Sequence, residues 1–324
     1  MALQNKTVAN AITLDATKAT FTGTLKFQAV NGVRVIGGKF DATGGSNAYG
    51  KSVVVYSSSN ISFDKVSVIS SVNYPEAGIS FQNVTNGQVT NSTFTNVGVG
   101  VGVTGSNHIS LTGNKVVGAT KDGFDVYDDH FVLVSGNSCS GGQPEANAHP
   151  DCVQLASTAG HPSVSDIVVT NNIATGATQG FTSFLGKGTG SLRITISQNI
   201  VNSTFPQGIA CYSCVDSFIT NNYLSAEPGA AHFVNMNIIG GSDNTVTGNS
   251  WLSDAVYLPT DYASAYFKLT GTAYVPTATH GSDGAFGDSA AGSMVPEPGQ
   301  WMLMIFGFVI VGLGHRRHAR MVAA

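Results

Sequence analysis

A short pattern that recurs nine times is the feature that most constrains this chain. It reads apolar, any, apolar, any, Gly or Asn, Asn, any, apolar, as in residues 109–116 (ISLTGNKV) and 194–201 (ITISQNIV). Successive copies are 22 to 28 residues apart, except for one step of 35 residues. A fixed period of this length is typical of a solenoid in which each repeat forms one coil. The sixth position of the pattern falls at Gly38, Val66, Ser92, Asn114, Asn137, Asn172, Asn199, Asn222 and Asn249.

A second run of alternating apolar residues, often opened by Gly, lies between these copies, for example at residues 78–81, 100–103 and 123–126. Alternation with a period of two predicts β-strands. Asn suits the corners between strands because it tolerates the left-handed backbone conformation and because stacked amides can hydrogen-bond from coil to coil. Leucine-rich repeats have a similar period, but their Leu framework is absent, and a β-sandwich would show meander-like spacing rather than one pattern.

Over roughly residues 10–260 these repeats resemble the right-handed parallel β-helix proteins of the pectate-lyase-like superfold. We therefore predict an all-β chain in which residues 1–275 form a right-handed parallel β-helix of about nine to ten coils. The resemblance is specific for the fold and weak for function, because lyases, hydrolases, epimerases, tailspikes and adhesins all share this architecture.

The composition argues against nucleic acid as a partner. Only 10% of the residues are charged and the formal net charge is −4, whereas a phosphate-binding surface needs clustered Lys and Arg. A low charge with an uncharged polar surface suits a carbohydrate environment better.

The C-terminal region changes character. Residues 276–294 read as a flexible Gly/Ala/Ser/Asp linker, and residues 295–320 hold an apolar run that ends in a basic cluster. The apolar run predicts a short hydrophobic helix of ~21 Å, which is shorter than the ~30 Å hydrocarbon core of a membrane unless flanking residues help. An amphipathic or core helix is the alternative.

This tail closely resembles the PEP-CTERM sorting signal of Gram-negative bacteria, which implies export, recognition by an exosortase-type enzyme and cleavage near the Pro-Glu-Pro motif. The expected location is the cell surface or the extracellular matrix, with a transient or stable inner-membrane anchor through the tail. Such tails accompany an N-terminal signal peptide, and none is visible here, which suggests that the chain begins late. The residues that carry the resemblance are Pro296, Glu297, Pro298, Arg316 and Arg317.

Ionisable side chains gather in residues 122–130 (DGFDVYDDH) and 149–154 (HPDCVQ). Because one coil advances by ~4.8 Å, equivalent residues of successive coils become neighbours. This register places Asp122 against Asp151 and Asp125 against Gln154. It also places Gln179 and Gln207 in the column of Asp151, and it requires a corner at Gly123. His149 and Tyr127 should lie close by.

Three kinds of chemistry fit this group. Asp122 and Asp151 could bind Ca²⁺ that neutralises a uronate; His149 or Tyr127 could transfer a proton in β-elimination or C5 epimerisation; or the two carboxyl groups could act as acid and base in glycoside hydrolysis. Two carboxylates this close should raise one pKa. Lys187 and Arg193 are the candidates for holding a substrate carboxylate.

The His-Pro-Asp-x-x-Gln element, with Asp-Gly-Phe-Asp one coil earlier, is similar to a motif of bacterial β-helix proteins grouped with polysaccharide lyases and epimerases. The alginate-epimerase order Asp-Pro-His-Asp is not matched, and the basic stretch of pectate lyases is missing. The prediction is an exported protein that acts on an acidic extracellular polysaccharide, with a non-catalytic exopolysaccharide-binding protein and a glycoside hydrolase as alternatives. Its candidate catalytic residues are Asp122, His149 and Asp151, and its candidate substrate-binding residues are Asp125, Tyr127, Gln154, Gln179, Lys187 and Arg193.

Four cysteines in an exported chain suit disulfides. Cys139 and Cys152 bracket the long coil and could staple it, while Cys211 could pair with Cys214 or only face the core. Four aromatic residues could stack on sugar rings or fill the solenoid interior, namely Tyr127, Phe181, Tyr212 and Trp251.

Overall fold

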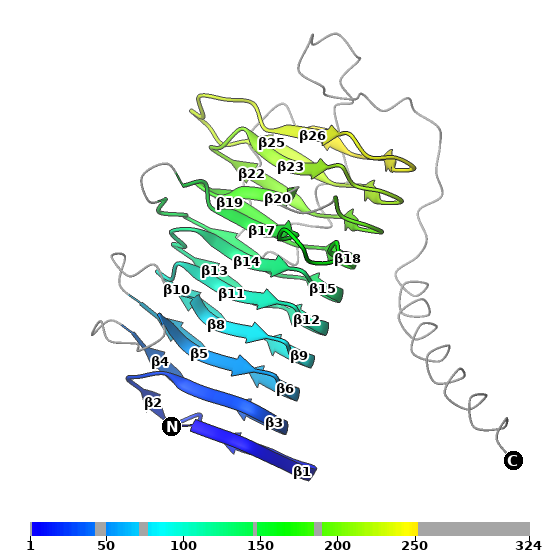
Figure 1. Cartoon of the computed structure of the whole chain (residues 1–324). Helices are drawn as coiled ribbons and strands as arrows, with labels where there is room; N and C mark the ends of the chain where they lie inside the picture. The colour runs from blue at the N-terminus through cyan, green and yellow to red at the C-terminus, as the bar shows by residue number, and fades with distance from the viewer. Residues whose placement is uncertain (1, 43–49, 71–76, 145–147, 185–189, 252–324) are drawn as a thin grey trace, which may run out of the picture. The chain divides into compact units, whose positions relative to one another are not determined.

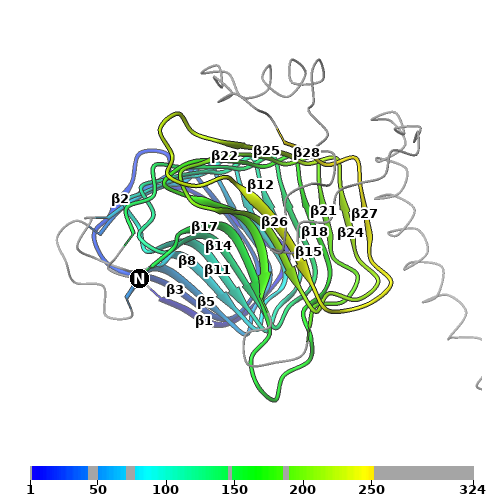
Figure 2. The same ribbon diagram turned by 90° about the horizontal axis from the view of Figure 1, so that it is seen from above.

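The chain folds into a parallel β-solenoid in which three walls of strands stack coil upon coil. The computed structural model describes residues 2–42, 50–70, 77–144, 148–184 and 190–251. Every strand pairing in this part of the chain is parallel, as the winding of successive coils requires. Figure 1 shows the coils stacked from β1 to β26, and Figure 2, along the stack, shows the walls around one interior.

The first two walls form one sheet of 18 strands and the third wall forms a sheet of ten strands. The first two coils contribute long strands to the large sheet, β1 (Ala2–Asp15) and β3 (Leu25–Ile36). The rest of the first wall comprises β5 (Lys51–Tyr56), β8 (Ala77–Gln82), β11 (Val99–Thr104), β14 (Asp122–Tyr127), β17 (Asp151–Ala156), β20 (Gln179–Phe184), β23 (Gln207–Tyr212) and β26 (Asn235–Ile239).

The second wall holds the strand that follows each first-wall strand along the chain. They are β6 (Ser59–Asp64), β9 (Thr85–Thr90), β12 (Asn107–Thr112), β15 (His130–Ser135), β18 (Ser165–Thr170), β21 (Thr195–Ser197), β24 (Phe218–Thr220) and β27 (Thr245–Thr247). The third wall comprises β2 (Thr20–Phe21), β4 (Lys39–Asp41), β7 (Ser67–Ile69), β10 (Thr93–Thr95), β13 (Lys115–Val117), β16 (Ser138–Ser140), β19 (Ile173–Gly176), β22 (Ile200–Ser203), β25 (Tyr223–Ala226) and β28 (Ser250–Trp251).

The recurring sequence pattern covers the end of a second-wall strand, a corner and the start of a third-wall strand. Two neighbouring residues share the corner. The fifth position adopts the left-handed conformation, for example Asn171 (φ 56°) and Gly136 (φ 65°). The sixth position instead turns its side chain inward, so that Asn137 and Asn172 are buried. The two properties expected of one corner Asn therefore belong to two successive residues.

The sixth-position residues form a ladder inside the solenoid. The side-chain oxygen of Asn172 accepts a hydrogen bond from the Asn137 backbone N–H at 2.9 Å, and its amide donates to Val134 O at 2.9 Å. The same arrangement joins Asn199 to Asn172 and Asn222 to Asn199. Each amide is thereby satisfied within the protein interior, where an unpaired one would be costly.

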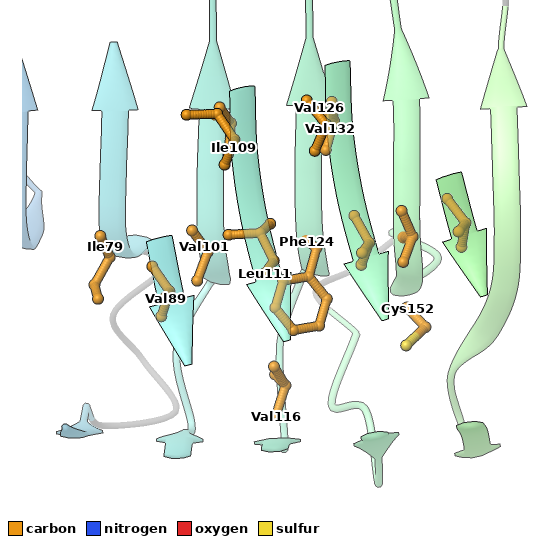
Figure 3. Close-up of a cluster of buried hydrophobic side chains, with 14 of the residues drawn as sticks. Ile79, Val89, Val101, Ile109, Leu111, Val116, Phe124, Val126, Val132 and Cys152 are labelled. Carbon is orange, nitrogen blue, oxygen red and sulfur yellow. The ribbon is translucent and has the colours of Figure 1, made fainter. Parts of the chain in front are cut away.

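Apolar side chains from all three walls fill the interior. Phe124 from β14, Leu111 from β12 and Val116 from β13 meet there (Figure 3). Phe63 lies between Phe27 and Phe81, with ring centroids 5.9 and 6.1 Å apart. Burying side chains of this size stabilises a fold by roughly 1.5–3 kcal/mol each. The apolar residues that alternate along the strands in the sequence are the ones that point into this core.

The structure confirms the predicted all-β parallel solenoid. The predicted linker at residues 276–294 and the sorting segment at residues 295–320, with its hydrophobic helix, lie outside the described residues. In the described ranges, no helix has the length and apolar character needed to cross a lipid bilayer.

Candidate functional site

The starts of three neighbouring first-wall strands bring the candidate residues together. Asp122, Asp151 and Gln179 are the first residues of β14, β17 and β20. Asp122 Oδ1 accepts a hydrogen bond from the Asp151 backbone N–H at 2.8 Å, and Asp151 pairs with Gln179 in the sheet. Asp125 pairs with Gln154. The column inferred from the spacing is therefore present.

A chain of polar contacts crosses the outer face of β14 and β17. His149 Nδ1 lies 3.7 Å from Asp151 Oδ2, and that same oxygen accepts a hydrogen bond from Gln154 Nε2 at 2.9 Å. The Tyr127 hydroxyl donates in turn to Gln154 Oε1. The two groups able to transfer a proton, His149 and Tyr127, are thus linked through Asp151 and Gln154. We call these four residues together with Asp122 and Asp125 the site.

Gly123 provides the corner that this arrangement requires. A Cβ at this position would lie 2.6 Å from Cys139 Sγ and 2.6 Å from Cys152 O, so no larger residue fits. Cys139 and Cys152 form a disulfide beneath it, which closes the long coil between β16 and β17. Cys152 directly follows Asp151, so this disulfide anchors the site from below; Figure 3 shows Cys152 in the interior. Cys211 and Cys214 form the second disulfide.

Burial and mutual repulsion keep protons on the carboxyl groups. Burial, and then the nearby Asp151 charge, raises the pKa of Asp122 to about 7. Burial also raises the pKa of Asp125 well above its usual range, and the nearby Asp122 charge, together with a hydrogen bond from protonated Asp125 to Asp122, adds to this. Asp151 has its pKa raised by burial, against opposing hydrogen bonds from His149 and Gln154. At neutral pH the three carboxyl groups therefore carry fewer than three charges.

The proton-transfer groups are shifted upward as well. The Asp151 carboxyl group, as a hydrogen-bond acceptor, raises the pKa of His149 above its ordinary value, because it stabilises the protonated imidazole. Burial, followed by the charge of Asp125, raises the pKa of the Tyr127 hydroxyl. Tyr127 consequently stays protonated and can only donate its proton to an acceptor of high basicity.

Exposure separates the residues that a ligand can reach from those that it cannot. The His149 side chain is 51% exposed, while the side chain of Asp151 is 0% exposed. Asp122 is 9% exposed. Of these three residues, His149 is therefore the one that a large substrate can contact, and the Asp151 carboxyl group lies beside its imidazole, 3.7 Å away.

Arg193, one of the two candidates for binding a substrate carboxylate, is not part of the site. Arg193 lies before β21 at the opposite end of the first-wall strands, where its guanidinium donates two hydrogen bonds of 2.7 Å to Asp166. Arg193 directly follows Leu192, which bridges to Ser165 of the second wall, so Arg193 does not lie in the column of Asp151. Lys187 lies outside the described residues.

The aromatic candidates divide between the interior and the surface. Phe181 is fully buried in the core. Tyr212 stays half-buried at the surface, with its ring 5.4 Å from that of Phe184, and Trp251 donates from Nε1 to Val234 O near the last described coil.

Two further residues beside the site were not identified from the sequence. Thr182 pairs with Gln154 in the sheet, and its hydroxyl donates a hydrogen bond to Val153 O at 3.3 Å. Phe184 lies near His149, with ring centroids 6.3 Å apart. Both positions follow from continuing the same register by one more coil, so the signal that located Gln179 was also available for them.

The donor set does not match what Ca²⁺ requires. Calcium takes six to eight oxygen ligands, but one oxygen of Asp122 already accepts a backbone hydrogen bond and one of Asp151 already accepts from Gln154. Across the described ranges, no group of three or more His, Cys, Asp or Glu side chains is arranged to hold a metal. We derive no chemical step through calcium.

A surface hollow of about 450 Å³ lies elsewhere, against the first coils between residues 17–20 and 36–39. It contains no residue of the site. The site is therefore identified by its contacts and its electrostatics rather than by this hollow.

Comparisons with known proteins agree on the fold. The family described as "Right handed beta helix region" matches residues 31–222. The surface protein and adhesin PfbA of Streptococcus pneumoniae is similar in structure, with a TM-score of 0.56, 14% identity, and coverage of 72% of this chain and 68% of that chain. No curated protein matches the sequence.

Two further solved structures share the winding more loosely. An alginate lyase from a Paenibacillus species has a TM-score of 0.45 and 13% identity, with 72% of this chain and 89% of that chain covered. A mutant tailspike protein of the E. coli bacteriophage HK620, in complex with a pentasaccharide, has a TM-score of 0.45 and 15% identity, with 75% and 49% covered. Identities this low show the fold alone.

Proposed function

This chain belongs to the right-handed β-helix family, and on that premise we propose that it acts on an acidic extracellular polysaccharide by removing a proton from a uronate ring. The observation that carries this proposal is the contact between His149 and Asp151, in which a half-exposed imidazole is backed by a buried carboxyl group at 3.7 Å. Geometry of this kind orients a general base and tunes its pKa.

The reaction would begin with neutral His149 taking the proton at C5, next to the uronate carboxylate. In β-elimination the electron pair forms the C4–C5 double bond while the C4–O bond breaks, and the leaving oxygen takes a proton from an acid. In epimerisation, C5 instead receives a proton on the opposite face. Tyr127 suits the role of acid, because its raised pKa keeps it protonated.

The protonated carboxyl groups support an acidic substrate. Asp122 has its pKa raised to about 7 by burial, and the pKa of Asp125 is also raised by the same cause. Because a raised pKa keeps part of these groups protonated, they repel a sugar carboxylate less than fully ionised groups would. The charge on Lys121 lies close enough to lower the pKa of Asp125, and it would also favour an anion.

Glycoside hydrolysis fits less well. That reaction needs two carboxyl groups on either side of the glycosidic bond. Here Asp151 is fully buried and Asp122 is 9% exposed, so neither presents its oxygens to a substrate as the structure stands.

A non-catalytic protein that binds exopolysaccharide is the second candidate. It is favoured by the burial of the three carboxyl groups, which could simply tie successive coils together through the shared hydrogen bond between Asp122 and the Asp151 backbone. In that case His149 would contribute contact area to a bound polymer but no proton transfer.

Incubation with alginate and with polygalacturonate in D₂O separates these candidates. Elimination produces a conjugated double bond that absorbs in the ultraviolet, and epimerisation incorporates deuterium at C5. We expect His149→Gln to lose at least ~10²-fold of either activity, as is typical for a general base. Polymer turnover by His149→Gln at the wild-type rate would contradict the proposal, and polymer retention without any turnover in the wild type would favour the binding protein.

The chain offers a matched control and a pH test. His161 also lies near a carboxyl group, with its Nδ1 3.8 Å from Asp128 Oδ2, but it is outside the site, so His161→Gln should retain full activity. Asp151→Asn removes the hydrogen bond that raises the pKa of His149. The rate should therefore begin to rise at lower pH in Asp151→Asn, because His149 becomes neutral earlier, and its maximum should be lower because the imidazole is less well oriented.

Export and anchoring are a separate part of the proposal. The C-terminal motif at Pro296, Glu297 and Pro298, followed by Arg316 and Arg317, supports recognition by an exosortase-type enzyme and a membrane contact before cleavage. Mass spectrometry of the protein isolated from a host with and without such an enzyme would test it, because cleavage near Pro298 removes the last segment of the chain.

A further inference from the structure

The side chain of Gln154 lies between the two groups that the proposed chemistry uses. Its Oε1 accepts a hydrogen bond from the Tyr127 hydroxyl, and its Nε2 donates a hydrogen bond of 2.9 Å to Asp151 Oδ2. The same carboxyl oxygen lies 3.7 Å from His149 Nδ1. The amide therefore contacts the proposed acid directly and reaches the proposed base through one carboxyl group.

The solenoid itself does not require an amide at this position. The pairing register places Gly102 two coils before Gln154 and Ala210 two coils after it, in the same row of the first wall. Neither residue has a polar side chain, yet β11 and β23 pair with their neighbours in the same parallel way. The two side-chain hydrogen bonds of Gln154 therefore belong to the site and not to the general construction of the coils.

The two contacts determine how the amide is oriented. An ionised carboxyl group can only accept hydrogen bonds, so the Nε2 end of Gln154 has to face Asp151 while Asp151 carries its charge. The Oε1 end then faces Tyr127, and the phenol has to be the donor. Hydrogen bonds to an ionised group are roughly twice as strong as those to a neutral one, so protonation of Asp151 would loosen the whole arrangement.

The charge of Asp151 depends on the hydrogen bonds that this carboxyl group receives. Burial raises its pKa, and hydrogen bonds from His149 and Gln154 act in the opposite direction. The carboxyl groups of Asp122 and Asp125 face it from β14 and interact with its charge, whereas β20, which pairs with β17 on the other side, carries no titratable side chain. Without the Gln154 amide, Asp151 would keep its proton to a higher pH and would hold His149 less firmly.

We propose that Gln154 is a positioning residue, which holds the Tyr127 hydroxyl and the Asp151 carboxylate in fixed directions and does not bind the polymer. This inference rests on the proposed function and deepens it, because it assigns one side chain to the orientation of both the acid and the base. It gives Gln154 a role other than the substrate contact predicted from the sequence. The polymer meets His149, whose side chain is 51% exposed, while both ends of the Gln154 amide are engaged within the protein.

Gln154→Met tests this role, because the new side chain has a similar length and forms neither hydrogen bond. The substitution should lower kcat roughly tenfold, as the misplacement of catalytic groups does, and should leave KM for polygalacturonate or alginate within about twofold of the wild type. The pKa of Asp151, followed by carbon-13 NMR titration of its carboxyl group without substrate, should rise, because a donor that stabilises its charge is lost.

Two further variants separate the ends of the amide and control for the substitution. Tyr127→Phe removes only the contact to Oε1, so it should lower kcat and leave the titration of Asp151 unchanged. Gln82→Met is the matched control, because Gln82 is a glutamine of β8, outside the site, that donates to Ser80 Oγ at 3.4 Å. It should change neither the kinetics nor the titration.

An unchanged titration of Asp151 in Gln154→Met would overturn this inference. A raised KM with an unchanged kcat would overturn it too, because that combination indicates a lost substrate contact. If the wild type turns over neither polymer, the proposed function fails, and the titration still decides whether Gln154 holds the Asp151 carboxylate: a higher pKa of Asp151 in Gln154→Met supports that role, and an equal pKa rules it out.

Discussion

Asp129 occupies the turn position that Ser106 holds one coil earlier. A residue at this position has to form the hydrogen bonds of an uncharged serine. The Ser106 hydroxyl accepts a hydrogen bond from the Val84 N–H at 2.9 Å and donates to Thr104 O at 3.2 Å. Asp129 Oδ1 likewise accepts from the Ser106 N–H, but its Oδ2 is buried with no partner among the described residues. Only a protonated carboxyl group can both accept and donate as serine does. Burial accordingly raises the pKa of Asp129 to about 8.

Asp129→Asn should therefore stabilise the protein increasingly as the pH rises. In the unfolded chain this carboxyl group ionises near its usual pKa, whereas in the folded chain it keeps its proton until about pH 8. The unfolded state thus binds fewer protons over this window, and the wild type loses roughly 1.4 kcal/mol of stability per pH unit from this group. Chemical denaturation of both proteins between pH 4 and pH 9 should show a difference that grows up to about pH 8 and then levels off. A difference that does not depend on pH would contradict the assignment of a buried, protonated Asp129.

At the scale of the strand, the start of β14 depends on the absence of a side chain at Gly123. A methyl group there would press on Cys139 Sγ and on Cys152 O, both at 2.6 Å, and neither the disulfide nor the next coil can move away easily. Gly123→Ala should lower the free energy of unfolding by roughly 1–3 kcal/mol, the usual cost of overpacking, and should displace Asp122. Gly102→Ala is the matched control, because a Cβ at Gly102 in the neighbouring strand meets nothing within 4 Å. Thermal unfolding of the two variants should differ clearly, and equal melting temperatures would argue against this packing.

The strand register could be predicted because the sequence spacing alone determines which residues face each other in a parallel stack. That rule correctly placed Asp125 beside Gln154 and Gln179 beside Asp151. It does not show in which wall a residue such as Arg193 lies once coil lengths vary. Burial could not be predicted either. Asp151 is sealed from solvent while His149 two residues away is half exposed, and the strand register says nothing about this difference.

At the scale of the molecule, each coil touches only the coils before and after it. The free energy of unfolding should therefore be close to the sum of the contributions from each coil and from each interface between neighbouring coils. The Asn ladder is one such term and repeats at nearly every interface in the second half of the described chain. The repeat made this architecture predictable from the sequence, because one pattern specifies every coil. The repeat does not predict the structure of the two ends of the stack, because a terminal coil has a neighbouring coil on one side only.

Asn172→Ala should divide the unfolding of the solenoid into two steps. Asn172 joins Asn137 on one side and Asn199 on the other, and its removal leaves buried backbone and amide groups unpaired on both sides. Each such group costs roughly 1–3 kcal/mol, which is enough to uncouple the coils before residue 172 from those after it. Hydrogen exchange at increasing denaturant should then show β5–β15 and β20–β27 opening at different concentrations. Asn249→Ala in the last described coil, where the ladder contact is to Asn222, should only loosen that end. A single transition shared by both halves of Asn172→Ala would mean that the core, and not the ladder, couples the coils.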